Sequence, residues 1–401
     1  MKKIFSLVLA VLMVASCAVA FASCNGGSKA LFEKDPEDNV IVKIGGIGPL
    51  TGDYASYGNS VKNGAQIAVD MLNESGALKG IKFELLFEDS EGDGTKAVNA
   101  FGKLQDDGMN VSLGGVLSGE TKNIVASAAE SGILVLTPSA SAKDAINKDN
   151  AFRVCFNDPQ QGLYAAEIIK EKGLATKIAL FYDNGNDYCK GNADTFKSRA
   201  AELGLQIVTE QTYTEGSNTD FSTQITAIKE AGAELVFMPI YYSDAAKFLR
   251  QAVDTLDTVF FGVDGLDGLI GECGTEHASD CEDVILLTPY FADSVDPTVK
   301  SFVEAYEEKF GATPDQFAAD GYDAVLAIAE AIEENGFTPD QLMEITAEDF
   351  NKKMVAAMTK ITVTGATGVM TWTADGETDK DPNVLQIKGG EYVEYKTADA
   401  E

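Results

Sequence analysis

Past residue 40 the chain alternates short apolar runs with longer segments whose apolar residues recur at helical spacing. The run at 40–44 is rich in Val and Ile, and the next segment places Val61, Ala65, Ala68 and Leu72 on one helical face. Similar strand-like runs recur at 83–87, 111–113, 133–136, 177–182, 205–208, 235–238, 259–263 and 284–287. Short strands that alternate with helices are typical of a parallel α/β sheet.

This alternation runs twice along the chain, before residue 158 and again after residue 176. Past Pro289 it stops: predicted helices follow each other, and short strands then close the chain. We therefore predict an α/β protein of two lobes, each a mostly parallel sheet flanked by helices, with several hinge crossovers. A ligand cleft is expected where the strand ends of the two lobes face each other. The expected domains are an N-terminal lobe of residues 40–157 and 289–367 and a C-terminal lobe of residues 158–288 and 368–396.

Residues 1–23 have the pattern of an export signal. Lys2 and Lys3 precede an apolar stretch too short to span a bilayer, and small residues then lead to Cys24. A cysteine directly after small residues resembles the lipobox of bacterial lipoproteins, whose thiol is acylated. Cys17 is a competing match, but the polar residues after Cys24 suit a tether better. We expect a linker over 24–39 and a lipid anchor at the outer face of the cytoplasmic membrane, or a periplasmic location.

The chain has 31 basic and 63 acidic residues, which give a formal net charge of −32. A surface of this sign repels nucleic acid and anionic lipid head groups, so neither is an expected partner. No later stretch is long and apolar enough for a membrane helix, so the membrane contact we expect is through the N-terminal lipid alone.

Export also decides how the remaining cysteines are interpreted. Cys273 and Cys281 flank a short step rich in Gly and acidic residues, which in an oxidising compartment predicts a local disulfide. Cys155 and Cys189 could form a second pair, but their spacing does not require it. His277 is the only histidine and no CxxC motif occurs, which argues against a metal site and against most nucleophile–histidine schemes. We expect no catalysis and no cofactor.

A glycine-rich block at 46–52 follows the first predicted strand. It lacks the GxGxxG spacing of dinucleotide-binding loops, and Pro49 removes an amide that would face phosphate. Further fragments follow in order along the chain: Tyr57-Gly58, Thr137-Pro138-Ser139-Ala140-Ser141, Phe152-Arg153, Arg250-Gln251-Ala252 and Gly321-Tyr322-Asp323-Ala324. Together, from residue 40 to residue 393, they resemble the type I periplasmic solute-binding proteins of branched-chain amino acid ABC importers.

The resemblance implies a ligand site in the cleft. On the first lobe it assigns the ligand carboxylate to Ser118, assisted by Ser139 and Ser141. Hydroxyls and free amides at strand-to-helix turns suit an anion, although Ser at such places also caps helices. On the second lobe it assigns the ligand α-ammonium to Asp264, which follows the apolar run at 259–263. A lone Asp at a strand end is otherwise a turn former.

Aromatic side chains complete the implied site. Tyr241 falls on a position that contacts ligand, and Tyr57 and Tyr188 fall on rings that cover it from either lobe. Rings that shield a closed site from water suit this role, and plain packing is the alternative. Tyr290 and Phe291 are also expected at the side-chain pocket.

The implied function is capture of a small amino acid, branched-chain by preference, outside the membrane. A monomer would close its lobes on the ligand and deliver it to the permease and ATPase subunits of an ABC importer. One alternative is the same fold binding an amide, urea or an aromatic acid, which loss of the ammonium–Asp264 pairing would mark. Another is a ligand sensor for a membrane receptor.

Overall fold

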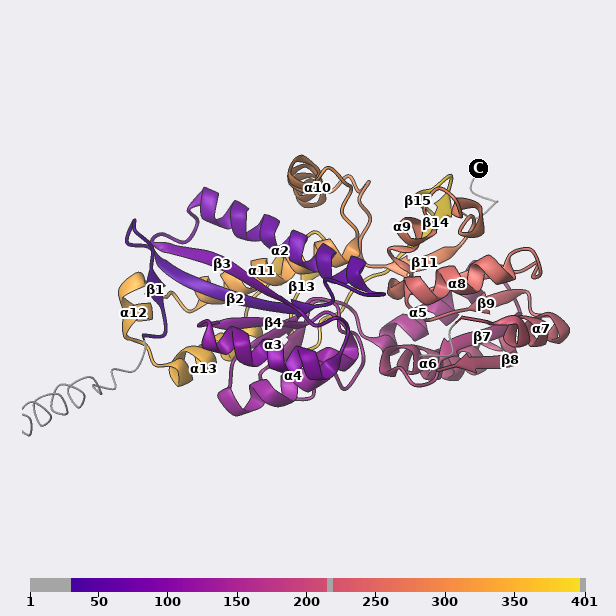
Figure 1. Cartoon of the computed structure of the whole chain (residues 1–401), viewed down its shortest axis with the longest axis horizontal. Coiled ribbons are helices and arrows are strands. Elements are labelled where there is room, and N and C mark those ends of the chain that lie inside the picture. The colour runs from indigo at the N-terminus through magenta and orange to yellow at the C-terminus, as the bar shows by residue number, and fades with distance from the viewer. Residues whose placement is uncertain (1–29, 215–218, 397–401) are drawn as a thin grey trace, which may run out of the picture. The chain divides into compact units, whose positions relative to one another are not determined.

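Two β-sheets form the framework of the protein, whose computed structural model describes residues 30–214 and 219–396 (Figure 1). Each sheet is mostly parallel and flanked by helices, which confirms the predicted fold class. The predicted lipidation site Cys24 and its rival Cys17 lie outside the described residues. Among the described residues no helix is long and apolar enough to cross a membrane.

The first sheet is built around β2, whose alternate residues Val40, Val42 and Ile44 are fully buried. β3 pairs with β2 in parallel, and β4, β5 and β6 continue the sheet in parallel from β2, while β1 pairs antiparallel with the start of β2. The strands are β1 (Glu33–Lys34), β2 (Val40–Gly48), β3 (Ile81–Asp89), β4 (Val111–Gly115), β5 (Val135–Thr137) and β6 (Ala151–Arg153). The helices between them are α2 (Ala55–Ser75), α3 (Gly94–Asp106) and α4 (Ser118–Ser131).

The second sheet has the order β15-β14-β11-β10-β9-β7-β8, with β14 and β15 antiparallel at one edge. Fully buried rings such as Phe181, Phe237 and Phe261 fill its core. Its strands are β7 (Lys177–Asp183), β8 (Gln206–Tyr213), β9 (Leu235–Phe237), β10 (Val259–Gly262), β11 (Ile285–Thr288), β14 (Asn383–Lys388) and β15 (Glu391–Glu394). Its helices are α5 (Asp158–Glu171), α6 (Asp187–Leu203), α7 (Ser222–Ala231), α8 (Tyr242–Ala252) and α9 (Leu269–Cys273).

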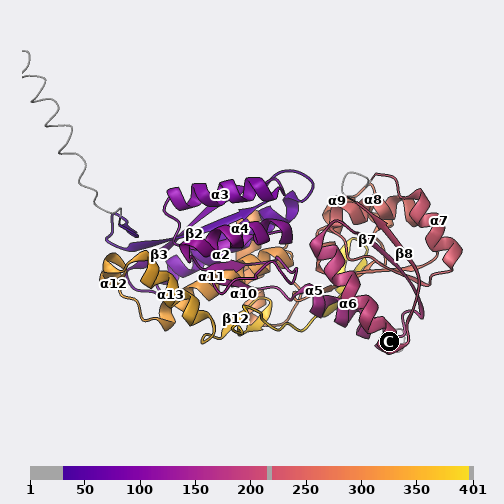
Figure 2. The same ribbon diagram turned by 90° about the horizontal axis from the view of Figure 1, so that it is seen from below.

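After β11 the chain returns to the first lobe. α11 packs along α2, and Figure 2 shows α11, α12 and α13 beside the elements of the first sheet. The short strands β12 (Val363–Gly365) and β13 (Gly368–Met370) then form a separate hairpin, and the expected domain boundary at 367/368 falls in its turn. The returning helices are α10 (Pro297–Phe310), α11 (Gln316–Glu334), α12 (Pro339–Glu344) and α13 (Ala347–Met358).

Glycine lets α2 and α11 approach backbone to backbone. A Cβ added at Gly64 would overlap the carbonyl oxygen of Ala318, and one at Gly321 would overlap that of Val61. The Ser60 hydroxyl also donates to Asp315 Oδ2 at 2.6 Å, joining residues 255 positions apart. The first lobe is therefore closed by a helix that comes late in the chain.

We expect Gly64→Ala to destabilise the protein by about 1–3 kcal/mol, because the added methyl group forces two packed helix backbones apart. The matched control is Gly102→Ala on α3, where an added Cβ meets no atom within 4 Å. Alanine is the better helix former, so the control should be neutral or stabilise by about 0.5–1 kcal/mol. Urea unfolding measures both changes in the free energy of unfolding, provided that its slope against urea concentration is the same in all proteins compared. Equal effects at the two positions would contradict the packing argument.

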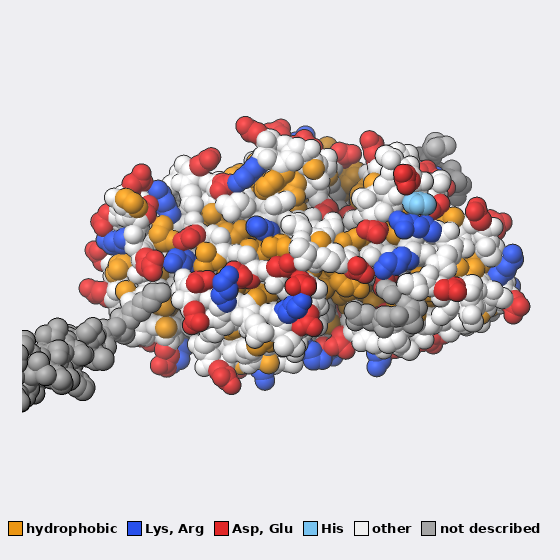
Figure 3. All heavy atoms as spheres, in the orientation of Figure 1, with side chains coloured by type: hydrophobic (Ala, Val, Ile, Leu, Met, Phe, Trp, Pro, Cys, Tyr) orange, Lys and Arg blue, Asp and Glu red, His pale blue; other side chains and the backbone are white. Residues whose placement is uncertain are grey.

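Cys273, the last residue of α9, forms a disulfide with Cys281, whereas Cys155 and Cys189 are buried free thiols. On the face drawn in Figure 3, Asp and Glu side chains are scattered over elements of both lobes, as the negative charge of the chain requires. Among the described residues no group of three or more His, Cys, Asp or Glu side chains is arranged to hold a metal ion.

Candidate functional site

A small cavity lies between the two lobes, at the ends of strands from both sheets. All seven residues that the resemblance assigns to ligand line it: Tyr57, Ser118, Ser139, Ser141, Tyr188, Tyr241 and Asp264. Val116, Leu117, Gly265 and Phe317 complete the lining. Its volume is about 10 Å³, which is room for roughly one water molecule. A ligand as large as an amino acid therefore needs the lobes to part before it can enter.

Hydroxyl groups form the wall from the first lobe. Ser118 is the first residue of α4, and its Oγ accepts the Ala142 amide at 3.1 Å, so its own proton stays available to a ligand. The Ser139 hydroxyl instead donates to the Val116 carbonyl at 2.8 Å. The N–H groups in the first turn of α4 have no partner within the helix, which favours an anion at this wall.

Arg153 holds the loop that carries these serines. Its side chain is fully buried and donates to the carbonyl oxygens of Ala140 and Ala142 at 2.7 and 3.0 Å. Its Nε lies 3.1 Å from a carboxylate oxygen of Glu377, which also accepts the Asn157 amide group at 3.0 Å. The guanidinium thus ties the loop to the two chain segments that lead into the second lobe.

Asp264 forms the opposite wall, directly after β10. Its side chain is 4% exposed; Oδ2 accepts the Gln161 amide at 2.9 Å, while Oδ1 has no hydrogen-bond partner. Burial raises the pKa of the Asp264 carboxyl to about 7, against hydrogen bonds from Tyr188 and Gln161 that lower it. A cation that meets Oδ1 would favour the ionised form. This wall suits an ammonium group.

Four aromatic rings enclose the space between the walls. Tyr188 and Tyr241 stack at 4.9 Å between ring centroids, and Tyr57 contacts Tyr241 at 5.7 Å and Phe317 at 4.1 Å. Gly265 lies against them, and a Cβ there would overlap the Tyr188 hydroxyl, which instead accepts the Gly265 amide at 2.9 Å. Apolar ring faces next to Leu117 suit an aliphatic side chain.

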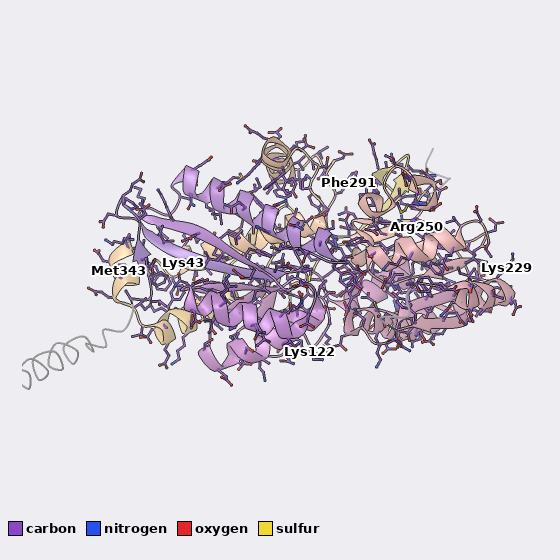
Figure 4. All side chains as sticks on the ribbon, viewed as in Figure 1. Lys43, Lys122, Lys229, Arg250, Phe291 and Met343 are labelled. Atoms are coloured by element: carbon purple, nitrogen blue, oxygen red, sulfur yellow. A yellow bond between two sulfur atoms is a disulfide. The ribbon has the colours of Figure 1, made fainter. Side chains whose placement is uncertain are left out.

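Direct contacts join the lobes around the cavity. The Tyr57 hydroxyl donates to the Gly265 carbonyl at 2.5 Å, and the Gln316 side chain donates to the Asp264 carbonyl at 3.0 Å. At the rim, Lys122 projects from α4 and lies 3.0 Å from Asp187 of α6 (Figure 4). These contacts hold the closed arrangement in which both walls reach the same cavity.

One expectation about the side-chain pocket is wrong. Tyr290 and Phe291 line a different cavity, with Tyr392 and Asp315, because β11 ends at Thr288 and the chain there turns toward α10. Phe317 at the start of α11 takes the place expected of them. Phe317 and Gln161 are the site residues that the sequence analysis missed. The Asp-Gln-Phe step before a long apolar helix was the available signal for Phe317.

Known proteins that resemble this chain fall in one family. A family model described as periplasmic binding protein matches residues 41–391. A Leu/Ile/Val-binding protein homolog of Brucella melitensis is 30% identical over 348 residues, which cover 86% of this chain and 91% of the relative.

Two solved structures are similar over most of their length. The leucine binding protein LivK of Thermotoga maritima has a TM-score of 0.78 and 27% identity, covering 88% of this chain and 98% of that one. The branched-chain amino acid transporter substrate binding protein LivJ of Streptococcus pneumoniae, in complex with isoleucine, has a TM-score of 0.79 and 27% identity, covering 88% and 97%. The match spans both sheets and the segments between them.

Proposed function

Because this chain belongs to the periplasmic binding protein family, whose members bind solutes outside the cytoplasm, we propose that it captures a branched-chain amino acid and delivers it to an ABC importer. The observation that carries the proposal is the opposition of two polar walls across one apolar cavity. Ser118 offers a hydroxyl proton on one side, and Asp264 offers an unpartnered carboxylate oxygen on the other. A zwitterion with an aliphatic side chain matches both walls and the rings between them.

The proposed mechanism is a clamp. The ligand carboxylate binds the first lobe at the Ser118 hydroxyl, assisted by the segment of Ser139 and Ser141, and the α-ammonium binds the second lobe at Asp264. Only a ligand that touches both lobes has the differential affinity needed to favour the closed form. Tyr57, Tyr188 and Tyr241 then exclude water. The closed monomer docks on permease subunits whose ATPase partners supply the energy, and the protein is tethered to the membrane by a lipid at Cys24.

Calorimetry on the mature chain tests the ligand class. Leucine, isoleucine and valine are expected to bind, with affinity well above that for urea, acetamide or benzoate. Small-angle scattering should show that saturating leucine removes any open population and leaves a single compact form. Binding of benzoate but not leucine would replace the proposal with an aromatic-acid carrier. Binding of leucine without any change in scattering or in proteolytic sensitivity of the interlobe segments would contradict the clamp.

A further inference from the structure

Gln161 contacts Asp264 through both ends of its side-chain amide. It lies in the first turns of α5 and is fully buried. Its Nε2 donates to Asp264 Oδ2 at 2.9 Å, and its Oε1 accepts the backbone amide of Asp264 at 3.3 Å. The same Nε2 lies 3.4 Å from the Phe156 carbonyl. The Gln161 amide is therefore fixed by the Phe156 carbonyl, and it binds both the backbone amide and the carboxylate of Asp264.

This pair of bonds decides which carboxylate oxygen is free. A carboxylate at the end of a short side chain turns readily about its last bond. With Oδ2 held by Gln161, Oδ1 is the oxygen without a partner, and Asp264 lines the cavity. The Asp264 carbonyl is held separately by Gln316 at 3.0 Å, so the backbone and the side chain have independent supports.

We propose that Gln161 is a positioning residue of the ligand site: its amide fixes the Asp264 carboxylate so that Oδ1 is presented, ionised, to the ligand ammonium. The proposal rests on the proposed function for the identity of the ligand group. A glutamine suits the task better than a lysine or arginine, because it donates a hydrogen bond without a charge that would repel the ammonium. The alternative role is purely structural, with Gln161 joining α5 to the turn after β10.

Hydrogen bonds from Tyr188 and Gln161 both lower the pKa of Asp264 against burial, and of the two side chains Gln161 is the one that binds the carboxylate and the backbone amide of Asp264 together. Burial raises the pKa of each titratable neighbour that Asp264 influences, so these groups favour their neutral forms: Tyr57 on α2, Cys155 after β6, Asp158 on α5, Tyr188 on α6 and Asp320 on α11. Two buried cations act on these neighbours: Arg153 is engaged by Glu377 and by two carbonyl oxygens, and Lys380 donates to the carbonyl and hydroxyl oxygens of Thr367. Loss of the Gln161 hydrogen bond should therefore raise the pKa of Asp264.

The test replaces Gln161 with methionine, which keeps the length of the side chain and removes its donor. The matched control is Gln160→Met at the next position of the same helix. The Gln160 amide donates to Asp379 at 2.8 Å and its oxygen accepts the Asn157 amide, without contact to Asp264. Both variants lose a hydrogen-bonded glutamine from the start of α5, so they share any cost to the helix and differ in the support of Asp264.

The first measurement needs no ligand. Carbon-13 NMR of the side-chain carboxyls in the mature chain follows the titration of Asp264. Gln161→Met should move its pKa upward from the value of the unsubstituted protein, because a hydrogen bond to the ionised form is lost, and Gln160→Met should leave it in place. An unmoved pKa in Gln161→Met would overturn the proposal. If the methionine variant does not fold, Gln161→Glu keeps the shape and should move the pKa in the same direction.

The second measurement is calorimetry with leucine and with 4-methylpentanoate, which lacks the ammonium group. Gln161→Met should weaken leucine binding about tenfold at pH 7, since a hydrogen bond to a charged group is removed. Binding of 4-methylpentanoate should change less than about twofold. Equal losses for both ligands would show a structural role and overturn the proposal. If the unsubstituted protein does not bind leucine, the proposed function itself fails, and this outcome is separate from the NMR result.

Discussion

Replacing Asp264 with asparagine is expected to weaken binding of a branched-chain amino acid by about tenfold or more while the fold survives. The amide keeps the shape of the side chain and removes the charge that faces the ammonium. Asp264 is 4% exposed, so the lost pairing is desolvated. A hydrogen bond between charged groups of this kind contributes roughly 1.5–3 kcal/mol, and an ammonium left buried without a partner costs more. Calorimetry with leucine measures the loss.

The control for this prediction is again the analogue without an ammonium group. It should bind the unsubstituted protein poorly and lose little more in Asp264→Asn, because it never had the pairing. A double cycle of two proteins and two ligands isolates the coupling. If both ligands lose the same amount, Asp264 supports the turn after β10 and the amino acid proposal loses its main argument.

The unliganded protein is expected to be more stable at pH 5 than at pH 8. Burial raises the pKa of Glu120, Asp264 and Asp267 to about 7 in each case, above the values of the unfolded chain. A carboxyl with a raised folded pKa contributes stability that is fully present below its unfolded pKa and is lost as pH rises through the folded pKa. The loss should therefore fall between about pH 4 and pH 7 and amount to a few kcal/mol. Thermal unfolding across this range measures it.

Glu120→Gln isolates one of these groups. Glu120 accepts hydrogen bonds from the Ser90 hydroxyl and from the Leu117 amide, and the uncharged glutamine cannot ionise there. The variant should lose part of the difference between pH 5 and pH 8. Leucine should also reduce the difference, since an ammonium at Asp264 stabilises the ionised carboxylate. A melting temperature that rises from pH 5 to pH 8 in the unsubstituted protein would contradict the assignment of neutral buried carboxyls.

Much of the fold followed from hydrophobic periodicity, because long elements carry many apolar positions. The alternation of short runs and amphipathic segments predicted both parallel sheets. The misses are short elements. β6 has three residues and α12 has six, and neither lies in a continuous apolar run of the kind that marked β5 and β9, which are also three residues long. Their positions depend on packing against elements far away in the sequence.

The residues of the candidate site also fall into a group that could be predicted from the sequence and a group that could not. Asp264, Ser118 and Tyr241 follow strands, and the ends of neighbouring parallel strands meet at one edge of a sheet. Their gathering around one cavity was therefore open to prediction from the sequence and the family resemblance. Gln161 and Phe317 lie on helices that enter the site from the side. Nothing local marks Gln161, because its role comes from the tertiary contact alone, and the only local signal for Phe317 is the Asp-Gln-Phe step before an apolar helix.

The late helix α11 has a consequence for how the chain folds. The second lobe takes β7 to β11 from one continuous stretch, so most of its core can assemble from nearby residues. The first lobe cannot be completed before α11 is made, since α2 finds its partner only when Gly64 packs against Ala318 and Gly321 packs against Val61. Contacts of such long sequence separation slow folding. We expect the middle of the chain to acquire native structure first, and the first lobe to remain exposed to proteases and to aggregation until the chain is nearly complete.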